Sequence, residues 1–314
     1  MVDNTTLALV FAGQGSQSIG MMAGFSDVPV VDATLQEASD ILKVDIIGML
    51  KAGPEEALAQ TVNTQPVMLA AGVATFRAWT SLGGPAASFY AGHSLGEYSA
   101  LVAAGALEFK DALPLVRFRA EAMQAAVPEG TGGIAAVLGL DEAAVQSVCA
   151  DAAQGEVLEA VNLNSPGQTV IAGHRTAVER GMALAKERGA KRALMLPMSV
   201  PSHCALMKPA AEKLEAYLRD VPMKAAVVPV IQNADVQAFA TPEEIKAALV
   251  RQLHRPVRWI ETVQALAARG ATTVGECVPG KVLTGLNKRI VPDVQCVALA
   301  DAAAMRTLIE GSPS

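Results

Sequence analysis

The pentapeptide Gly92-His93-Ser94-Leu95-Gly96 constrains the fold more than any other part of this sequence. An apolar run, 86–91, comes directly before it, and a helix-forming run comes directly after it. A G-x-S-x-G sequence between a strand and a helix is typical of a nucleophile elbow, in which glycines let the backbone turn sharply and present the serine hydroxyl at the edge of a sheet. The sequence therefore predicts a nucleophilic serine at position 94. The alternative is a glycine-rich turn with an incidental serine.

Apolar runs alternate with helical patterns along the chain. Residues 7–12 form a continuous apolar run that ends at a glycine, which is typical of a buried parallel strand. Helical patterns follow, the longest over 65–82, and strands separated by helices indicate a parallel sheet with helices on its faces. The alternation returns over 201–314, with a strand predicted over 227–232 and a helix over 242–253. This part of the chain is expected to complete the same sheet.

The pattern changes at residue 130. From there the sequence predicts four strands and two helices in the order β-α-β-β-α-β, with Asp141 capping the first helix. This order is that of a ferredoxin-like unit. We therefore expect an α/β fold in which an α/β-hydrolase-like catalytic domain, 1–129 and 198–314, carries a parallel sheet. An inserted ferredoxin-like subdomain is expected at 130–197.

Composition excludes several classes of function. The chain has 314 residues, of which 51% are hydrophobic, and a net charge of −6 without a basic run, so we expect no nucleic-acid partner. No apolar stretch is long enough to span a membrane, and no basic segment precedes the first apolar run as in a signal peptide. Four cysteines stand at no metal-binding spacing, which indicates reduced thiols in a cytoplasmic protein and no metal site: Cys149, Cys204, Cys277 and Cys296.

A serine nucleophile needs a base, and the chain offers four histidines. His93 is adjacent to Ser94, so the two side chains are expected to point apart. His174 opens a helix of the inserted unit and should face solvent, while His254 lies at a helix end, where a cationic ring is favourable. His203 lies in the loop that leaves the inserted unit, at a position expected to reach a cleft between two domains. Its alternative role is that of a loop histidine bonded to backbone.

Two supporting parts of a serine site are less clear from the residues alone. No Asp or Glu in the second half of the chain identifies itself as the acid that orients the histidine, but a backbone carbonyl can accept from Nδ1–H instead. An oxyanion hole needs two donors. The amide of Leu95 is one candidate, and the loop 13–15 supplies the other unless it is only a structural turn.

Several motifs together resemble the malonyl-CoA:acyl carrier protein transacylases of bacterial fatty acid synthesis. They occur in the family's order between about residue 7 and residue 292. They are G-Q-G-S-Q at 13–17, G-H-S-L-G-E-Y at 92–98, V-N at 161–162 with N-S-P-G-Q at 164–168, V-P-S-H at 200–203, and G-K-V-L-T-G-L at 280–286.

The resemblance implies a ping-pong acyl transfer. Ser94 would accept malonyl from coenzyme A as an ester and pass it to the phosphopantetheine thiol of an acyl carrier protein. His203 would be the base, oriented by the main-chain carbonyl of Gln252, and the main-chain amides of Gln14 and Leu95 would form the oxyanion hole. No permanently bound cofactor is implied, and the family suggests a monomer.

The resemblance also implies how the acyl group is selected. Arg119 would bind the free carboxylate of malonate, because a guanidinium can hold a carboxylate through two parallel hydrogen bonds. An acetyl group has no carboxylate to offer. Without the resemblance, Arg117 and Arg119 would be interpreted as a solvated face of a helix over 113–125. His93 and Asn162 are further candidates for the pocket that holds substrate or coenzyme A.

The sequence departs from the family at two positions. Ala12 stands where a proline usually precedes the first glycine of G-Q-G-S-Q, and Val278 stands where the family usually has a glycine before the conserved Gly-Lys pair. The first departure is expected to leave the chemistry intact. The second is expected to alter a loop near the entrance for coenzyme A or the carrier.

Carrier docking and the alternative functions complete the expectations. Carrier proteins of this kind are acidic, and so is this chain, so docking requires a local basic patch, for which Lys281, Lys288 and Arg289 are candidates. One alternative is a serine thioesterase or esterase on the same elbow, which would not need Arg119. A second is a stand-alone acyltransferase of a polyketide synthase, and a third is a non-catalytic carrier-binding module in which Ser94 is a turn residue.

Overall fold

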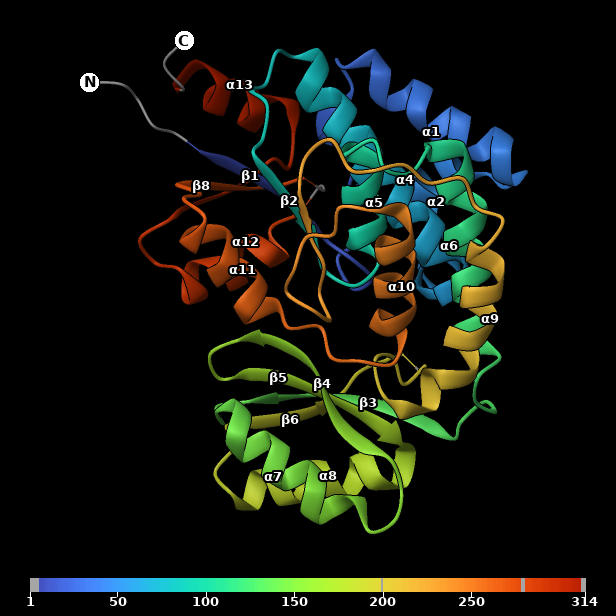
Figure 1. Ribbon diagram of the computed structural model, residues 1–314, viewed down its shortest axis with the longest axis vertical. Coiled ribbons are helices and arrows are strands. Elements are labelled where there is room, and N and C mark those ends of the chain that lie inside the picture. Colours follow the sequence, from blue (N-terminus) through green and yellow to red (C-terminus); the bar gives the residue numbers. More distant parts are fainter. Residues whose placement is uncertain (1–5, 199, 278–279, 312–314) are drawn as a thin grey trace.

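A computed structural model describes residues 6–198, 200–277 and 280–311, and within them the chain forms two separate sheets (Figure 1). All neighbouring strands of the larger sheet run parallel, as the alternating pattern predicts, and their order is β7-β2-β1-β8-β9. Its strands are β1 (Leu7–Phe11), β2 (Phe89–Gly92), β7 (Val230–Ile231), β8 (Thr273–Glu276) and β9 (Gln295–Ala298). Every residue of β1 is buried, in agreement with its continuous apolar sequence.

Helices cover both faces of this sheet. Figure 1 shows α11 and α12 on one side of it and α4, α5 and α6 on the other. Most of the 21 residues of α4 are buried, which explains why its sequence is apolar on all sides. The helices are α1 (Pro29–Leu42), α2 (Ile46–Ala52), α3 (Glu55–Ala59), α4 (Thr61–Ser81), α5 (Gly96–Ala103), α6 (Phe109–Gln124), α9 (Lys208–Leu218), α10 (Pro242–Leu253), α11 (Trp259–Ala268), α12 (Val282–Ile290) and α13 (Ala302–Gly311), with single 3₁₀ turns at Ala23–Phe25 and Ala205–Met207.

The smaller sheet is antiparallel, in the order β4-β5-β3-β6. This order and the β-α-β-β-α-β sequence of elements are those of a ferredoxin-like unit, so this part of the fold prediction is confirmed. Asp141 begins the first helix as predicted, since its Oδ1 accepts the Ala144 N–H at 2.8 Å. The elements are β3 (Gly132–Leu138), α7 (Glu142–Ala153), β4 (Leu158–Ser165), β5 (Gln168–His174), α8 (Arg175–Glu187) and β6 (Arg192–Met195).

The two faces of the smaller sheet bury different neighbours. Val137 and Ile171 belong to the core under α7 and α8, which Figure 1 shows on the face turned away from the larger sheet. Ile134 and Val170 alternate with them and form a second cluster with Cys204, from the segment that follows the insertion. The smaller sheet is therefore packed on both faces.

We propose that 130–197 is an inserted subdomain. Its support is that this segment contains both helices and all four strands of the smaller sheet, and a hydrophobic core of its own. The backbone of Val257 joins it to the rest of the chain, because it donates to the Val161 carbonyl at 2.9 Å and accepts from the Leu163 N–H at 3.0 Å. Strand β4 is thus fixed against the segment between α10 and α11.

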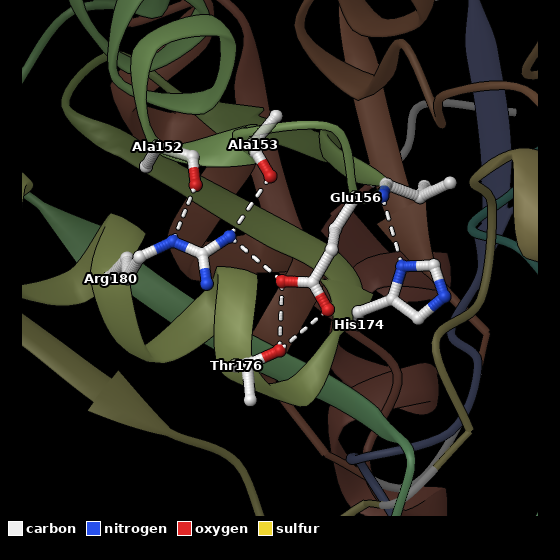
Figure 2. Close-up of polar contacts among 7 residues, drawn as sticks. Ala152, Ala153, Glu156, His174, Thr176 and Arg180 are labelled. Carbon is white, nitrogen blue, oxygen red and sulfur yellow. Dashed lines mark hydrogen bonds and ion pairs between the residues drawn. The ribbon is translucent and has the colours of Figure 1, made fainter.

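A half-buried arginine binds the end of helix α7. Arg180 donates from Nε to the carbonyl of Ala152 and from Nη2 to that of Ala153, both at 2.9 Å, and these are two of the last carbonyls of the helix (Figure 2). The same Nη2 donates to Glu156 at 2.8 Å, and the hydroxyl of Thr176 donates to the same carboxylate. The helix ends in a cap at Gln154, which has a left-handed backbone conformation, and Arg180 of α8 binds its last two carbonyls.

Two local expectations are wrong. His174 does not face solvent: it is half-buried, and its Nδ1 accepts the Val157 N–H at 2.9 Å (Figure 2). The strand predicted over 227–232 shrinks to the two residues of β7. The Pro229 carbonyl accepts the Tyr90 N–H of β2 at 2.9 Å, but Pro229 has no N–H of its own to extend the ladder toward residue 227.

Candidate active site

The chain turns at Ser94 between β2 and α5 with a φ of +52°. A left-handed φ is uncommon outside glycine and is typical of strained functional positions. The flanking glycines serve another purpose than predicted, because neither has a positive φ. A Cβ at Gly92 would lie 1.9 Å from the Gly96 carbonyl carbon, and one at Gly96 would lie 2.0 Å from the Phe11 oxygen. They are needed for the close approach of strand and helix.

Asn233, directly beyond β7 and its neighbour Gln232, holds the elbow in this conformation. Its Oδ1 accepts the Ser94 N–H at 2.7 Å, and its Nδ2 donates to the Gly92 carbonyl at 2.7 Å. Asn233 itself is fully buried. The two bonds span the turn, so the amide offsets the cost of the left-handed serine.

His203 is placed as the sequence predicts for a base. Its Nε2 lies 2.7 Å from Ser94 Oγ, and its Nδ1 lies 2.7 Å from the main-chain carbonyl of Gln252. Because a carbonyl only accepts, Nδ1 carries the proton and the Nε2 lone pair faces the serine hydroxyl. The backbone carbonyl thus takes the place of the acid in a serine triad.

The environment keeps the His203 ring neutral. Burial lowers its pKa to about 3, with a second contribution from the positive charge of Arg119, while the bond to Gln252 opposes both. A neutral imidazole is the form that accepts a proton from serine. Burial and the charge of neighbouring Arg255 also lower the pKa of His254. This disfavours the cationic ring expected at this helix end.

Arg119, on α6, points into the site and is only 1% exposed. Its Nη1 donates to Gln65 Oε1 at 2.7 Å, and its Nη2 donates to Gln252 Oε1 at 3.0 Å and to Ser94 Oγ at 3.4 Å. All three oxygens are uncharged, and among the described residues no ion pair involves Arg119. A buried cation with only neutral partners is unusual, because burying charge is costly unless an anion compensates it. The solvated helix face suggested by the residues alone is therefore wrong for Arg119.

The side chain of Gln252 connects these groups. Its Nε2 donates to the Ser94 carbonyl and to Glu97 Oε2, each at 2.9 Å, while its Oε1 accepts from Arg119. Its main-chain oxygen holds His203. One residue of α10 therefore orients the base, the arginine and the elbow together.

The loop after β1 lies against the elbow. A Cβ at Gly13 would be 2.5 Å from the His93 oxygen, so only glycine permits this approach. Gln14 and Leu95 line the same cleft as Ser94. Their main-chain N–H groups remain the predicted oxyanion donors.

The site lies in a cleft of about 460 Å³ between the two sheets. Ser94, His203 and Arg119 line it, together with residues of the smaller sheet. Among them are the predicted pocket residues His93 and Asn162; His93 Nε2 lies 2.8 Å from Asn164 Oδ1, and Asn162 is buried.

The predicted carrier-docking residues lie elsewhere. Lys281 and Lys288 are exposed and line a second cavity, of about 670 Å³, beside β9 and α13, while Arg289 donates to Gln168 of the smaller sheet. Of the two departures from the family pattern, Ala12 is buried. Val278 lies outside the described residues.

Sequence reasoning missed three residues that complete this site. Gln65 and Asn233 stand in no recognisable motif, although Asn233 follows a strand that neighbours β2 and parallel strands end at one edge. Glu97 stands within the G-H-S-L-G-E-Y motif at 92–98, but the family resemblance implies no role for it. The described residues hold no cluster of metal-ligating side chains, and the four cysteines are buried and unpaired.

Comparison with known proteins shows the family of this chain. Residues 8–304 match the acyl transferase domain family. The chain is 52% identical to the malonyl CoA-acyl carrier protein transacylase of Escherichia coli K12 over 98% of its own length and 99% of that protein.

Two solved structures are also similar. An acyl-carrier-protein S-malonyltransferase from Burkholderia pseudomallei is 54% identical, with a TM-score of 0.96 over 98% of this chain and all of that one. A malonyl-transacylase in complex with a type II PKS acyl-carrier protein is 50% identical, with a TM-score of 0.96 and the same coverage.

Proposed function

The chain belongs to the acyl transferase family, and from this premise we propose that it transfers malonyl from malonyl-CoA to the phosphopantetheine thiol of an acyl carrier protein. The product would supply malonyl groups for fatty acid synthesis. Ser94 carries the acyl group between the two thiols.

One observation carries this proposal. The buried guanidinium of Arg119 lies 3.4 Å from the Ser94 hydroxyl and has only uncharged partners. An acyl group on Ser94 that ends in a carboxylate would supply the missing negative charge through charge-assisted hydrogen bonds. An acetyl group would leave the buried cation without an anion in direct contact, so the arrangement favours malonyl.

The first half-reaction acylates the serine. Ser94 Oγ attacks the thioester carbonyl and gives its proton to His203 Nε2, while the N–H groups of Gln14 and Leu95 hold the oxyanion. The carbon–sulfur bond then breaks, and the coenzyme A sulfur takes the proton from His203. The products are a malonyl ester of Ser94 and free coenzyme A.

The second half-reaction reverses these steps with another thiol. The phosphopantetheine thiol gives its proton to His203 Nε2 and its sulfur attacks the ester carbonyl. When the carbon–oxygen bond breaks, Ser94 Oγ recovers the proton from His203. Malonyl now forms a thioester with the carrier, and the enzyme is unchanged.

The substrate carboxylate would also strengthen the base. The charge of Arg119 is one cause of the low pKa of His203. A carboxylate that pairs with Arg119 removes part of this effect and raises the pKa of His203 toward the range useful for general-base catalysis. Selection for malonyl therefore acts on the rate of acylation as well as on binding.

The similar malonyl-transacylase solved with a type II PKS carrier shows that this fold also serves such carriers. An acyltransferase of a polyketide synthase is thus the second candidate. The cytoplasmic location, the monomeric state and the docking role of Lys281, Lys288 and Arg289 stay predictions.

Intact-mass measurement after mixing with malonyl-CoA tests the proposal. We expect a malonyl adduct on the wild-type chain, none on Ser94→Ala, and loss of the adduct when carrier protein bearing phosphopantetheine is added. The absence of any adduct on a folded wild-type protein would contradict the proposal and favour a carrier-binding module. Release of free malonate at the rate of coenzyme A release would favour a thioesterase.

A further inference from the structure

Within the part of the chain that the structure describes, Glu97 is the carboxylate whose charge acts on the buried cation Arg119. It lies in the first turn of α5, directly after the elbow, and its side chain is fully buried. Its Oε2 accepts the Asn233 N–H at 3.0 Å and Gln252 Nε2 at 2.9 Å. Its Oε1 has no hydrogen-bond partner among the described residues. The chemistry of acyl transfer given above does not use this group.

The amide of Gln252 stands between Glu97 and Arg119. It donates to Glu97 from Nε2 and accepts from Arg119 at Oε1, so its orientation is set by the negative group on one side and the positive group on the other. The two charges attract each other across this amide in a buried, low-dielectric setting. In the enzyme without substrate, Glu97 therefore compensates part of the charge of Arg119.

A malonyl group changes this balance. Its carboxylate would bind Arg119 directly, and the buried cluster would then hold two negative charges against one positive charge. Because Glu97 is the one that lacks direct contact with the guanidinium, it is the one that becomes less stable in the ionised form. Uptake of a proton by Glu97 restores neutrality.

Resting on the function proposed above, we propose that Glu97 is a positioning residue that exchanges with the substrate carboxylate as the counter-ion of Arg119. Where Glu97 is ionised in the enzyme without substrate, it takes one proton from solvent when a malonyl carboxylate binds Arg119. The substrate carboxylate then compensates the charge of Arg119 in place of Glu97.

Three other titratable groups near Glu97 and Arg119 are Tyr98, His203 and Asp235. Burial raises the pKa of Tyr98 to about 12, and burial with the charge of Arg119 lowers that of His203 to about 3. Asp235, beyond β7, forms an ion pair with Arg251 at 2.8 Å. Burial raises the pKa of Glu97 itself to about 7, although its bonds to Asn233 and Gln252 oppose this.

The sign of the pH effect follows from these values. Below about pH 7 Glu97 is already protonated and malonyl binds without proton uptake. Above that pH the proton must be taken up on binding, so the KM for malonyl-CoA rises by up to about tenfold per pH unit. Titration of the coenzyme A phosphate is common to all variants and cancels in their comparison.

Two measurements on the full chain test this inference. The first is the KM for malonyl-CoA between pH 6 and pH 8.5, set in that range because it brackets the pKa of about 7. We expect the KM to rise with pH in the wild type and to stay constant within about twofold in Glu97→Gln, at the level that the wild type has at low pH. The second is proton uptake in weakly buffered solution with a pH indicator, which should reach about half a proton per malonylated site at pH 7.

A matched control separates this role from a structural one. Glu276 is equally buried, at the end of β8, and accepts N–H groups of Leu283 and Thr284 instead of facing Arg119. Glu276→Gln should lower stability and keep the wild-type pH dependence of the KM. The same dependence in Glu97→Gln as in the wild type would overturn the inference.

Proton uptake by the wild type decides the matter even if Glu97→Gln does not fold. Malonylation without uptake, with the adduct confirmed by mass in the same sample, would overturn the role of Glu97 and leave the proposed function intact. Failure to form the adduct at all would instead contradict the proposed function.

Discussion

The charge of a single side chain, Arg119, influences both partners of the reacting serine. Its Nη2 approaches Ser94 Oγ, and its field adds to burial, the main cause, in lowering the pKa of His203. The base is therefore kept neutral over the physiological range and is not limited by its own protonation.

At the residue scale, removal of the base should cost most of the rate. His203→Ala leaves Ser94 without a proton acceptor, so acylation by malonyl-CoA should slow by about 10²- to 10⁴-fold. Stopped-flow release of coenzyme A measures this rate. A variant within about threefold of the wild type would show that another group removes the serine proton.

A second prediction at this scale concerns Asn233. Asn233→Ala removes both bonds that span the elbow, and it leaves a buried Ser94 N–H and Gly92 carbonyl without partners. We expect a loss of about 2 to 5 kcal/mol in the free energy of unfolding. We also expect acylation to slow by at least tenfold beyond what the loss of folded protein explains. Circular dichroism gives the folded fraction, and coenzyme A release from the same sample gives the rate of acylation. Slowing in proportion to the unfolded fraction alone would contradict a positioning role.

The residues of the site differ in how far the sequence reveals them. Ser94 and His203 could be predicted, because each lies in a short motif with a chemical reason for its residue types. Arg119 could be assigned only through the family resemblance, since nothing in the sequence of its helix distinguishes it from half-buried Arg117. Asn233 and Gln65 reach the site by folding of segments far from the elbow, so no local pattern indicates them.

At the element scale, the turn between β2 and α5 depends on close backbone contact. Gly96→Ala would place a Cβ 2.0 Å from the Phe11 oxygen of β1 and should cost at least about 3 kcal/mol of stability. Gly285→Ala is the matched control, because nothing lies within 4 Å of its Cβ position in α12, and it should stabilise by about 0.5 to 1 kcal/mol. Thermal unfolding compares the two. Equal stability of both variants would show that the contact does not require glycine.

Elements with strong local sequence signals, such as helix caps, are predicted more accurately than elements without them. Helix α10 occupies the predicted 242–253, because Thr241 and Glu244 form a capping box and Pro242 stands at its first position. Strand β7 is shorter than predicted because its pairing depends on Pro229 and on the edge position, not on its apolar composition. The sequence of strand β9 gives no clear strand signal, because exposed and buried positions do not alternate regularly along its four residues.

At the scale of the whole molecule, the site depends on two sheets that meet across one cleft. The parallel pairing of the larger sheet and the strand order of the smaller sheet could be anticipated from the sequence of elements, because strands separated by helices favour a parallel sheet and β-α-β-β-α-β is the order of a ferredoxin-like unit. The contact between them could not, since it rests on Val257 pairing with β4 and on Cys204 packing beneath β3 and β5. Such long-range contacts have no signature in the sequence of either segment.

Carrier docking is a prediction at the same scale. Replacement of Lys281, Lys288 and Arg289 by glutamate should slow the second half-reaction at low salt and spare the first, because a larger acidic carrier is repelled while small malonyl-CoA still reaches the cleft. Separate measurement of coenzyme A release and of malonyl-carrier formation distinguishes the two steps. Equal slowing of both, or of neither, would place the docking surface elsewhere.

The choice between malonyl-CoA and acetyl-CoA tests the central claim most directly. The measurement is the ratio of kcat/KM for the acylation of Ser94 by the two thioesters, in the wild type and in Arg119→Ala. If Arg119 selects the carboxylate, the wild type prefers malonyl strongly and the variant loses about a hundredfold or more of that preference, the value of two charge-assisted hydrogen bonds. An unchanged ratio in a folded Arg119→Ala would contradict the account.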